Sequence, residues 1–360
     1  MKLELLSKYR GQIMGAAMIW IMFFHSPIFS GGEAVKFFHT IGFYGVDMFL
    51  MVSGLGLYFS MRKSKGILDF YRKRAVRILP AYLIVTICWY VFCKTDLEIG
   101  DVILSILGVN YFRGTVYGRP PYFDWFLPTL FVLYLLTPLY DKLFQKVEAK
   151  WKLTALMSMI SPALCVFGHF TGRQVLYGSF VRIPVFLAGY CMGWFLYEKK
   201  EEKKGSWMVH IALLTGGMLL GWCVQNELKS ISQIFWGINA YPALLVAPAL
   251  SVLLGLIFKY AEKWLKIAGK VLMLPFTVCG RYSLEIYLLH QRLMEYMNSD
   301  ACAAFRGQIV SAVGNEWYYI LLALWSVAGA AALHELIALA TRMIGKKKAP
   351  TRTEKITDNG

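Results

Sequence analysis

Long apolar runs, separated by short polar and charged segments, dominate the chain between residues 11 and 341. A helix needs about 20 apolar residues to cross the hydrocarbon core of a bilayer, and ten runs reach or approach that length. The pattern predicts an all-α polytopic membrane protein with about ten transmembrane helices. The predicted spans are residues 11–29, 41–60, 79–93, 125–144, 153–170, 179–197, 207–223, 236–258, 271–290 and 317–341.

Two apolar runs are shorter than the others. Residues 79–93 are a short span, and residues 102–112 are too few to cross a bilayer. We therefore expect 102–112 to form one short re-entrant or interfacial helix. Counting it as an eleventh span would invert the orientation of everything that follows it.

The basic residues give the orientation. Most of the 38 lysine and arginine residues lie in alternate segments between the predicted spans. Cytoplasmic loops of membrane proteins carry an excess of such residues. Ten spans with both termini cytoplasmic place these basic segments inside, whereas an eleventh span would place most of them outside.

Composition agrees with this class. The chain is 57% hydrophobic and 17% charged, with a mean hydropathy of +0.49, whereas soluble domains are about 25% charged. The net charge of +16 does not indicate a nucleic-acid partner, because the basic residues cluster in alternate loops. The seven cysteines are scattered without metal-ligand spacing, so we interpret them as packing residues. The first apolar run has no cleavage site after it. We expect one transmembrane domain, residues 1–344, and a disordered basic cytoplasmic tail, residues 345–360.

Two ionisable residues lie inside the first two spans. Asp47, in "GFYGVDMFLMVSG", lies roughly 9 Å from the outer end of its span, and His25 lies roughly 6 Å from the outer end of the preceding span. Intramembrane ionisable residues are costly and usually functional. A carboxylate that binds one imidazole nitrogen fixes the tautomer and raises the basicity of the other, as in a general base. The alternative is a packing hydrogen bond without chemistry.

A basic cluster precedes the third span in "FYRKRAVRILPAY". Arg74 and Arg77, at i and i+3, share a helix face, and Pro80 marks the expected start of the span. Arginine forks match phosphate oxygens, so the pair is a candidate phosphate site. The alternative is an anchor on anionic lipid.

A third group lies in "CGRYSLEIYLLH". Arg281 and Glu285 are one helical turn apart near mid-membrane, and His290 is at the outer end of the span. They indicate a water-accessible cavity, or an ion pair that neutralises itself within the bundle. Other candidates are Arg182, Asp124, His334 and Glu335.

Four segments, in order, resemble motifs of the membrane acyltransferase-3 family. They are "GVDMFLMVSG" from Gly45 to Gly54, "FYRKRAVRILPAY", "WFLPTLFVLYLLTPL" from Trp125 to Leu139, and "YSLEIYLLH". Members of this family are integral membrane enzymes that move acetyl or other short acyl groups onto extracytoplasmic sugars, polysaccharides or other hydroxyl acceptors. The resemblance implies a bacterial cytoplasmic membrane, a cytoplasmic acyl-CoA donor near Arg74 and Arg77, and a critical histidine at His25.

One position departs from the family pattern. The family often has an arginine eleven residues before the histidine, where this chain has Met14. Arg10, fifteen residues before His25, lies on roughly the same helix face and is the candidate replacement.

The resemblance leads to a mechanistic hypothesis. Acyl-CoA docks from inside on Arg10, Arg74 and Arg77, and its pantetheine arm reaches His25. His25, oriented by Asp47, acts as general base or as covalent acyl carrier. The candidate substrate-binding residues are Ser53, Trp125, Arg281 and Glu285. Of these, Ser53 and Arg281 are candidate donors to the oxyanion.

The expected partners are acyl-CoA, an extracytoplasmic glycan or other hydroxyl acceptor, and the lipid bilayer, with no nucleic acid. We expect no metal and no permanently bound cofactor, and the oligomeric state stays open. The competing interpretations are a transporter or flippase for a lipid-linked sugar or small metabolite and a non-catalytic partner in an envelope assembly.

Overall fold

The computed structural model describes residues 3–27, 31–93, 98–112, 125–173, 176–198, 207–227 and 236–347. Every regular element in these residues is helical, as expected for an all-α protein. The first half of the chain forms α1 (Glu4–Lys8), α2 (Arg10–His25), α3 (Glu33–Thr40), α4 (Tyr44–Lys63), α5 (Ile67–Phe92), α6 (Ile99–Ile106), α8 (Phe126–Lys146), α9 (Lys150–Ser158) and α10 (Ile160–Phe170). The second half forms α11 (Tyr177–Phe180), α12 (Ile183–Tyr197), α13 (Trp207–Asn226), η2 (Trp236–Ala240), α15 (Ala243–Arg281), α16 (Ser283–Met297), η3 (Asp300–Cys302), α17 (Ala303–Val313) and α18 (Asn315–Lys347).

Eight helical segments within the described residues are long and apolar enough to cross a membrane. The protein is therefore a multi-pass membrane protein by length and composition. The expected first span is the 16-residue helix α2, which is shorter than a typical span. The expected ninth span is divided, because a break at Tyr282 separates α15 from the 15-residue helix α16.

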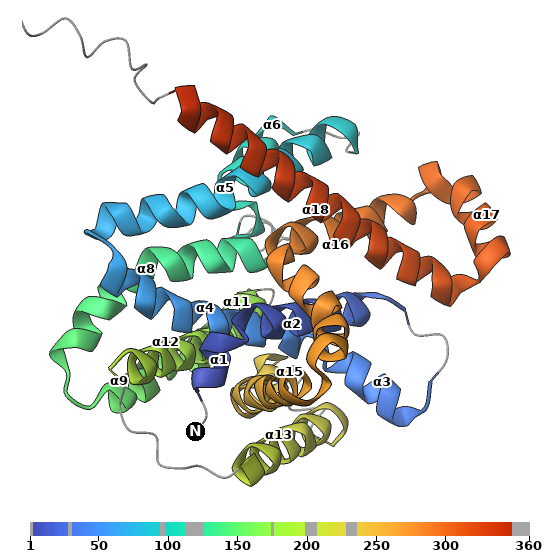
Figure 1. Ribbon diagram of the computed structural model, residues 1–360. Helices are drawn as coiled ribbons and strands as arrows, with labels where there is room; N and C mark the ends of the chain where they lie inside the picture. Colours follow the sequence, from blue (N-terminus) through green and yellow to red (C-terminus); the bar gives the residue numbers. More distant parts are fainter. Residues whose placement is uncertain are drawn as a thin grey trace, which may run out of the picture.

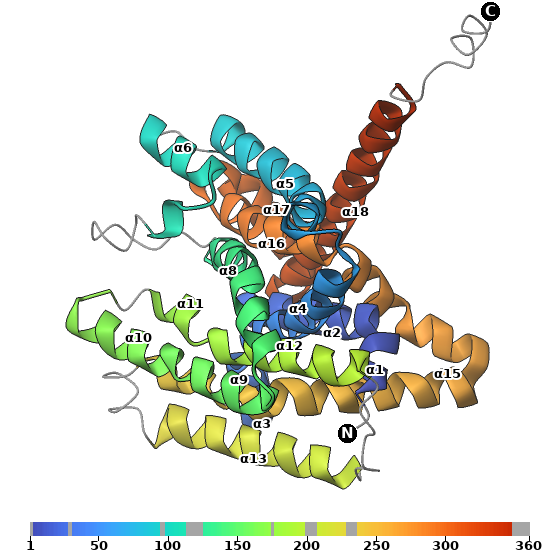
Figure 2. The same cartoon turned by 90° about the vertical axis from the view of Figure 1, so that its left-hand side faces the viewer.

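Helix α15 is itself two helical arms. Lys266 has φ 46° and ψ −110°, which no α-helix contains, so the chain reverses there. A Cβ added at Gly269 would overlap the carbonyl oxygen of Ala261, which shows that the two arms touch beside the turn. The hairpin is visible where α15 folds back at its end in Figure 2.

The structure confirms the prediction for the short segment 102–112 but not the one for the start of the third span. The piece expected at 102–112 begins with α6, whose eight residues are too few to cross a bilayer, as predicted. The basic cluster expected before the third span lies within the same helix as the span. Helix α5 begins at Ile67 and contains Pro80, so the prediction that Pro80 starts the span is wrong. Helix α18 ends at Lys347, and residues 348–360 of the expected tail lie outside the described residues.

Helix α4 is the central helix of the bundle, with α2 beside it and α12 packed along it (Figure 1). The contact between α4 and α12 relies on glycine. Gly189 and Gly193 are spaced as in a small-xxx-small motif, and Gly54 faces them from α4. A Cβ at Gly189 would overlap the carbonyl oxygen of Met51, and one at Gly54 would overlap that of Phe186. Glycine therefore permits the two backbones to touch.

The contact between α2 and the second arm of α15 has the same basis. Gly11 and Gly15 repeat the motif, and a Cβ at Gly15 would overlap the carbonyl oxygen of Phe276. On the opposite helix, a Cβ at Gly280 would overlap the carbonyl oxygen of Gly11. These two glycine contacts fix α12 against α4 and α15 against α2, and both α4 and α2 line the two cavities described below.

We expect Gly189→Ala to destabilise the folded protein by about 1–3 kcal/mol, the range for an extra methyl group in a tightly packed site. Thermal unfolding in detergent, followed by tryptophan fluorescence, measures the change. Gly216→Ala in α13 is the matched control, because nothing lies within 4 Å of its added Cβ. An equal effect of the two substitutions would contradict the role of Gly189 in helix packing.

Candidate functional site

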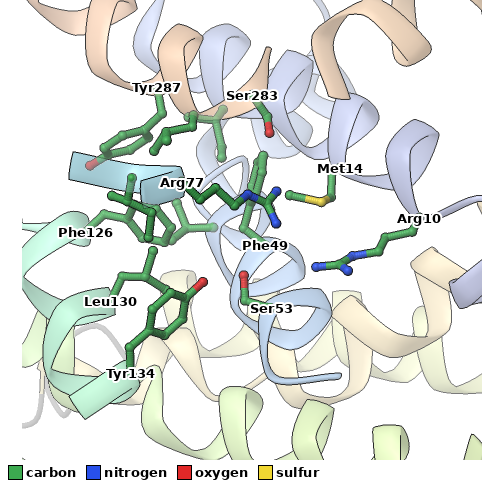
Figure 3. Close-up of a pocket in the computed structure, with 14 residues that line it drawn as sticks. Arg10, Met14, Phe49, Ser53, Arg77, Phe126, Leu130, Tyr134, Ser283 and Tyr287 are labelled. Atoms are coloured by element: carbon green, nitrogen blue, oxygen red, sulfur yellow. The ribbon is translucent and has the colours of Figure 1, made fainter. Parts of the chain in front are cut away.

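Two cavities lie in the centre of the bundle. The Arg10 cavity, about 60 Å³ in volume, is lined by residues of α2, α4, α5, α8 and α16, among them Arg10, Met14, Ser53 and Arg77 (Figure 3). The His25 cavity, about 410 Å³, is lined among others by His25, Trp125, Arg182 and Asn239. Six of the residues singled out from the sequence line these cavities although they come from distant parts of the chain: Arg10, His25, Ser53, Arg77, Trp125 and Arg182.

The two cavities are neighbours. Ile21, Val46 and Tyr287 line both of them, so these three side chains form the boundary between them. Ile21 and Val46 are buried, and Tyr287 packs against Phe126 with ring centroids 4.7 Å apart. An extended chain that entered the Arg10 cavity and passed this boundary would arrive in the His25 cavity. We call these three residues the neck.

His25 has a different partner from the expected one. Its Nδ1 lies 3.2 Å from Nε2 of His290. Nδ1 of His290 lies 2.9 Å from the carbonyl oxygens of both Ile286 and Tyr287. Because α2 and α16 are packed together, two histidines 265 positions apart in the sequence form one pair.

The backbone carbonyls determine where the protons of this pair lie. A carbonyl oxygen only accepts, so Nδ1 of His290 must donate to it and its Nε2, in the neutral form, is an acceptor. Nδ1 of His25 then donates to that nitrogen, which leaves Nε2 of His25 with a free lone pair. Neutral His25 is therefore arranged as a base, and His290 takes the orienting role that we expected of Asp47.

Asp47 binds Arg182 instead. Nε of Arg182 lies 3.4 Å from Oδ1 of Asp47, and the two side chains are only 7% and 1% exposed. Within the described residues, no hydrogen bond or ion pair joins Asp47 to His25. The expected pairing of Asp47 with His25 is therefore not what the structure shows. Asp47 is the counter-ion of a second buried charge.

The Arg10 cavity contains two guanidinium groups. Figure 3 shows Arg10 and Arg77 extending from opposite sides toward the centre of the cavity, near the hydroxyl groups of Ser53 and Tyr134. Arg10 lies against α4, where a Cβ at Gly56 would come within 2.6 Å of its Nη2. No carboxylate of the described residues forms an ion pair with Arg10 or Arg77. Met14, which occupies the family's usual arginine position, lines the same cavity.

Arg74 shares a helix with Arg77, as predicted, but its side chain contacts α4 and does not enter the Arg10 cavity. Its Nη2 donates to Oγ of Ser60 at 2.9 Å, and its guanidinium lies 6.0 Å from the ring centroid of Phe70. It does not line the Arg10 cavity. Arg74 connects α5 to α4, and the cavity receives only Arg77 from this cluster.

Arg281 and Glu285 lie outside both cavities. The expected pair between them is absent because the break at Tyr282 separates their helices. Nη2 of Arg281 instead lies 2.6 Å from Oε1 of Glu335, and Oε1 of Glu285 lies 2.8 Å from Nδ1 of His334. These contacts attach α15 and α16 to α18. Nothing in the two cavities supports the assignment of Arg281 and Glu285 as substrate-binding residues.

Several lining residues were not singled out from the sequence. Tyr287 lies in the quoted segment "YSLEIYLLH" and in the neck, and its spacing of three from His290 was the available signal. The His25 cavity also contains amide side chains that carry no pattern of their own in the sequence, from Gln225, Asn239 and Gln291. Asp124, a further candidate, lies outside the described residues.

The profile of a family described as an acyltransferase domain, acyltransferase 3, matches residues 15–335. The match begins within α2 and ends within α18, and it includes His25, Asp47, Arg77, Arg182 and His290. No curated protein and no solved structure matches the chain.

Proposed function

Because the chain belongs to the acyltransferase-3 family and is a multi-pass membrane acyltransferase, we propose that it transfers an acetyl or other short acyl group from cytoplasmic acyl-CoA to a hydroxyl group of an extracytoplasmic sugar or polysaccharide. The observation that carries the proposal is the pair of adjoining cavities. One contains two guanidinium groups that have no carboxylate partner among the described residues, and the other contains a histidine arranged as a base.

Ten crossings with both termini in the cytoplasm are part of the proposal. The turn at Lys266 supports them, because it divides the segment Gly237–Arg281 into two antiparallel arms. Helix α2, about 24 Å long at 1.5 Å per residue, adds a further crossing. In this orientation Arg10, Lys63 and Ile67, at the ends of α2, α4 and α5, face the cytoplasm together with the Arg10 cavity.

Acyl-CoA is the proposed donor because its negatively charged phosphates complement the two guanidinium groups of the Arg10 cavity. Guanidinium groups bind phosphate oxygens through paired, charge-assisted hydrogen bonds, and Arg10 and Arg77 have no competing carboxylate among the described residues. The pantetheine arm is long, thin and uncharged, which suits it to cross the boundary formed by Ile21, Val46 and Tyr287. The thioester would then lie beside His25.

The acceptor enters the His25 cavity from the other side of the membrane. Its lining combines aromatic rings, such as Trp125 and Tyr177, with amide and hydroxyl groups, such as Asn239 and Thr40. Aromatic faces and amides are suited to a sugar, which presents both apolar ring faces and hydroxyl groups. The neck keeps this cavity apart from the donor phosphates.

In the direct route, Nε2 of His25 takes the proton of the acceptor hydroxyl while its oxygen forms a bond to the thioester carbonyl carbon. The carbon–sulfur bond then breaks, and the thiolate of CoA takes the proton back from His25. In the covalent route, Nε2 attacks the thioester carbon and the carbon–sulfur bond breaks, so that CoA leaves as a thiolate. The acceptor hydroxyl then attacks the acyl group, its proton passes to Nε2 as the carbon–nitrogen bond breaks, and the thiolate takes that proton from His25. Both routes release CoA and an acyl ester.

The proposal is tested with purified protein in proteoliposomes that contain [¹⁴C]acetyl-CoA on the side of the Arg10 cavity and a crude envelope glycan on the other side. We expect label to move into the glycan across the membrane, with release of an equal amount of CoA. Succinyl-CoA is the second donor. Consumption of neither donor, together with no binding of either, would overturn the proposal and favour a transporter.

We expect His290→Ala to lower kcat about 10–100-fold, as loss of the partner that orients a functional histidine commonly does. The KM for acyl-CoA is expected to stay unchanged, because His290 does not line the Arg10 cavity. His290→Gln should recover part of the loss, since its amide oxygen accepts from Nδ1 of His25. His169→Ala in α10, which lines neither cavity, is the control. Equal kcat values for His290→Ala and wild type would contradict the pair.

A further inference from the structure

Arg182 is the one arginine among the described residues that line the His25 cavity. It lies at the junction between α11 and α12 and is 6% exposed. A cation buried this deeply in a membrane protein is expensive, and such residues usually line a functional pathway. Neither the reaction sequence above nor the phosphate-binding residues use it.

Three groups hold the guanidinium in place. Asp47 lies 3.4 Å from its Nε, and the rings of Trp125 and Phe43 lie 5.2 Å and 5.6 Å from its Cζ. Both rings line the His25 cavity, and cation–π contacts of this length stabilise a guanidinium without neutralising it. Arg182 is therefore fixed beside the position where we place the thioester.

The Asp47 contact is loose. Nε of Arg182 and both carboxylate oxygens of Asp47 are buried and lack a hydrogen bond of normal geometry. A charge-assisted hydrogen bond is normally about 2.7–2.9 Å long, shorter than the 3.4 Å observed. Asp47 balances the charge of Arg182 but does not occupy all the N–H donors of its guanidinium group. A second partner for Arg182 is thus compatible with the structure.

We propose that Arg182 is the catalytic cation that binds the oxyanion, and that Asp47 is a positioning residue that acts through Arg182 and not through His25. This inference rests on the proposed function. When the acceptor oxygen, or Nε2 of His25, forms its bond to the carbonyl carbon, the carbonyl π-electrons move to the oxygen. The N–H groups of Arg182 stabilise that negative charge, and the electrons return as the carbon–sulfur bond breaks.

This assignment replaces the earlier candidates for the oxyanion donor. Arg281 lies outside both cavities and is bound to Glu335. Ser53 lines the Arg10 cavity and not the His25 cavity. Arg182 and His25 line the same cavity, as an oxyanion donor and a base acting on one carbonyl group must.

The central variant carries Asp47→Asn and Arg182→Gln together. Removal of one charge alone leaves the other buried and unpaired, which is strongly destabilising, whereas removal of both avoids that cost. We expect the double variant to unfold within a few degrees of wild type, to bind acyl-CoA with unchanged affinity and to have a kcat about 10²–10³-fold lower. A wild-type kcat in a folded double variant would overturn the role of Arg182.

The single variants separate the two roles. Arg182→Gln and the double variant should have equal kcat values, because Asp47 has nothing to position once Arg182 is gone. A further loss of 10-fold or more in the double variant would overturn the positioning role and return Asp47 to His25. Arg182→Lys keeps the charge, and we expect its kcat to lie between those of wild type and Arg182→Gln.

The same assay distinguishes this inference from the proposed function. Transfer of label by wild type that is lost in His25→Ala supports an acyltransferase whatever Arg182 does. Absence of transfer by wild type overturns both. Transfer by wild type, no transfer by His25→Ala and full transfer by the double variant overturns only the inference.

Discussion

His25→Ala is expected to lower acyl transfer by about 10²–10⁴-fold, the contribution that a positioned general base makes. In the covalent route the loss is complete, because the acyl carrier itself is gone. The structural reason is the geometry of the pair, in which His290 occupies Nδ1 of His25 at 3.2 Å and leaves Nε2 free. Label from [¹⁴C]acetyl-CoA in glycan and in protein is counted for both proteins.

His169→Ala is the matched control for this substitution, since it removes an imidazole that lines neither cavity. Label that stays on wild-type protein before the acceptor is added, and is absent from His25→Ala, selects the covalent route. Activity of His25→Ala within twofold of wild type would show that the pair is only a packing contact between α2 and α16.

Simultaneous substitution of Arg10 and Arg77 by glutamine is expected to raise the KM for acetyl-CoA about 100-fold or more. Each charge-assisted hydrogen bond to a phosphate contributes about 1.5–3 kcal/mol, and no carboxylate among the described residues pairs with either arginine in place of the phosphate. The change in kcat should be much smaller, because these side chains bind the donor away from the reacting carbonyl. Initial rates over a range of acetyl-CoA concentrations measure both constants.

Two comparisons make this test specific. Arg72→Gln removes an exposed arginine of the same helix, which lies 3.7 Å from Asp69, and should leave the KM unchanged. Acetyl-pantetheine, which lacks the nucleotide phosphates, should be used equally well by wild type and by the double variant. An unchanged KM for acetyl-CoA in the double variant would assign the arginines to anionic lipid instead of CoA.

The apolar runs made the helical membrane class predictable, because backbone polar groups in hydrocarbon must be satisfied within a helix. Seven of the eight long apolar segments correspond to one predicted span each, and Gly237–Arg281 includes the eighth predicted span and part of the ninth. The reversal at Lys266 was predictable, because it falls in the charged segment 259–270 between the eighth and ninth predicted spans. The break at Tyr282 lies inside the ninth predicted span and was not predictable from hydropathy.

The sequence identified the site residues by their position along each span, whereas helix packing determines which residues they contact. His25 and Asp47 are both intramembrane ionisable residues near one end of their spans, which the sequence showed directly. Residues at similar depth can still face different neighbours, because depth gives a position along the helix axis and not a direction around it. Asp47 faces Arg182 of the α11–α12 junction, and His25 faces His290 of α16.

The sequence by itself determined the membrane class, the clustering of basic residues in alternate loops and the candidate residues His25, Asp47 and Arg77. Each of these depends on local composition and spacing. Only the tertiary structure decided that His25 is paired with His290, that Asp47 lies beside Arg182, and that Arg10 and Arg77 line one cavity together with Met14. The physical reason is close packing through glycine. It brings α2 against α15 and α4 against α12, and so sets which side chains from distant segments share a cavity.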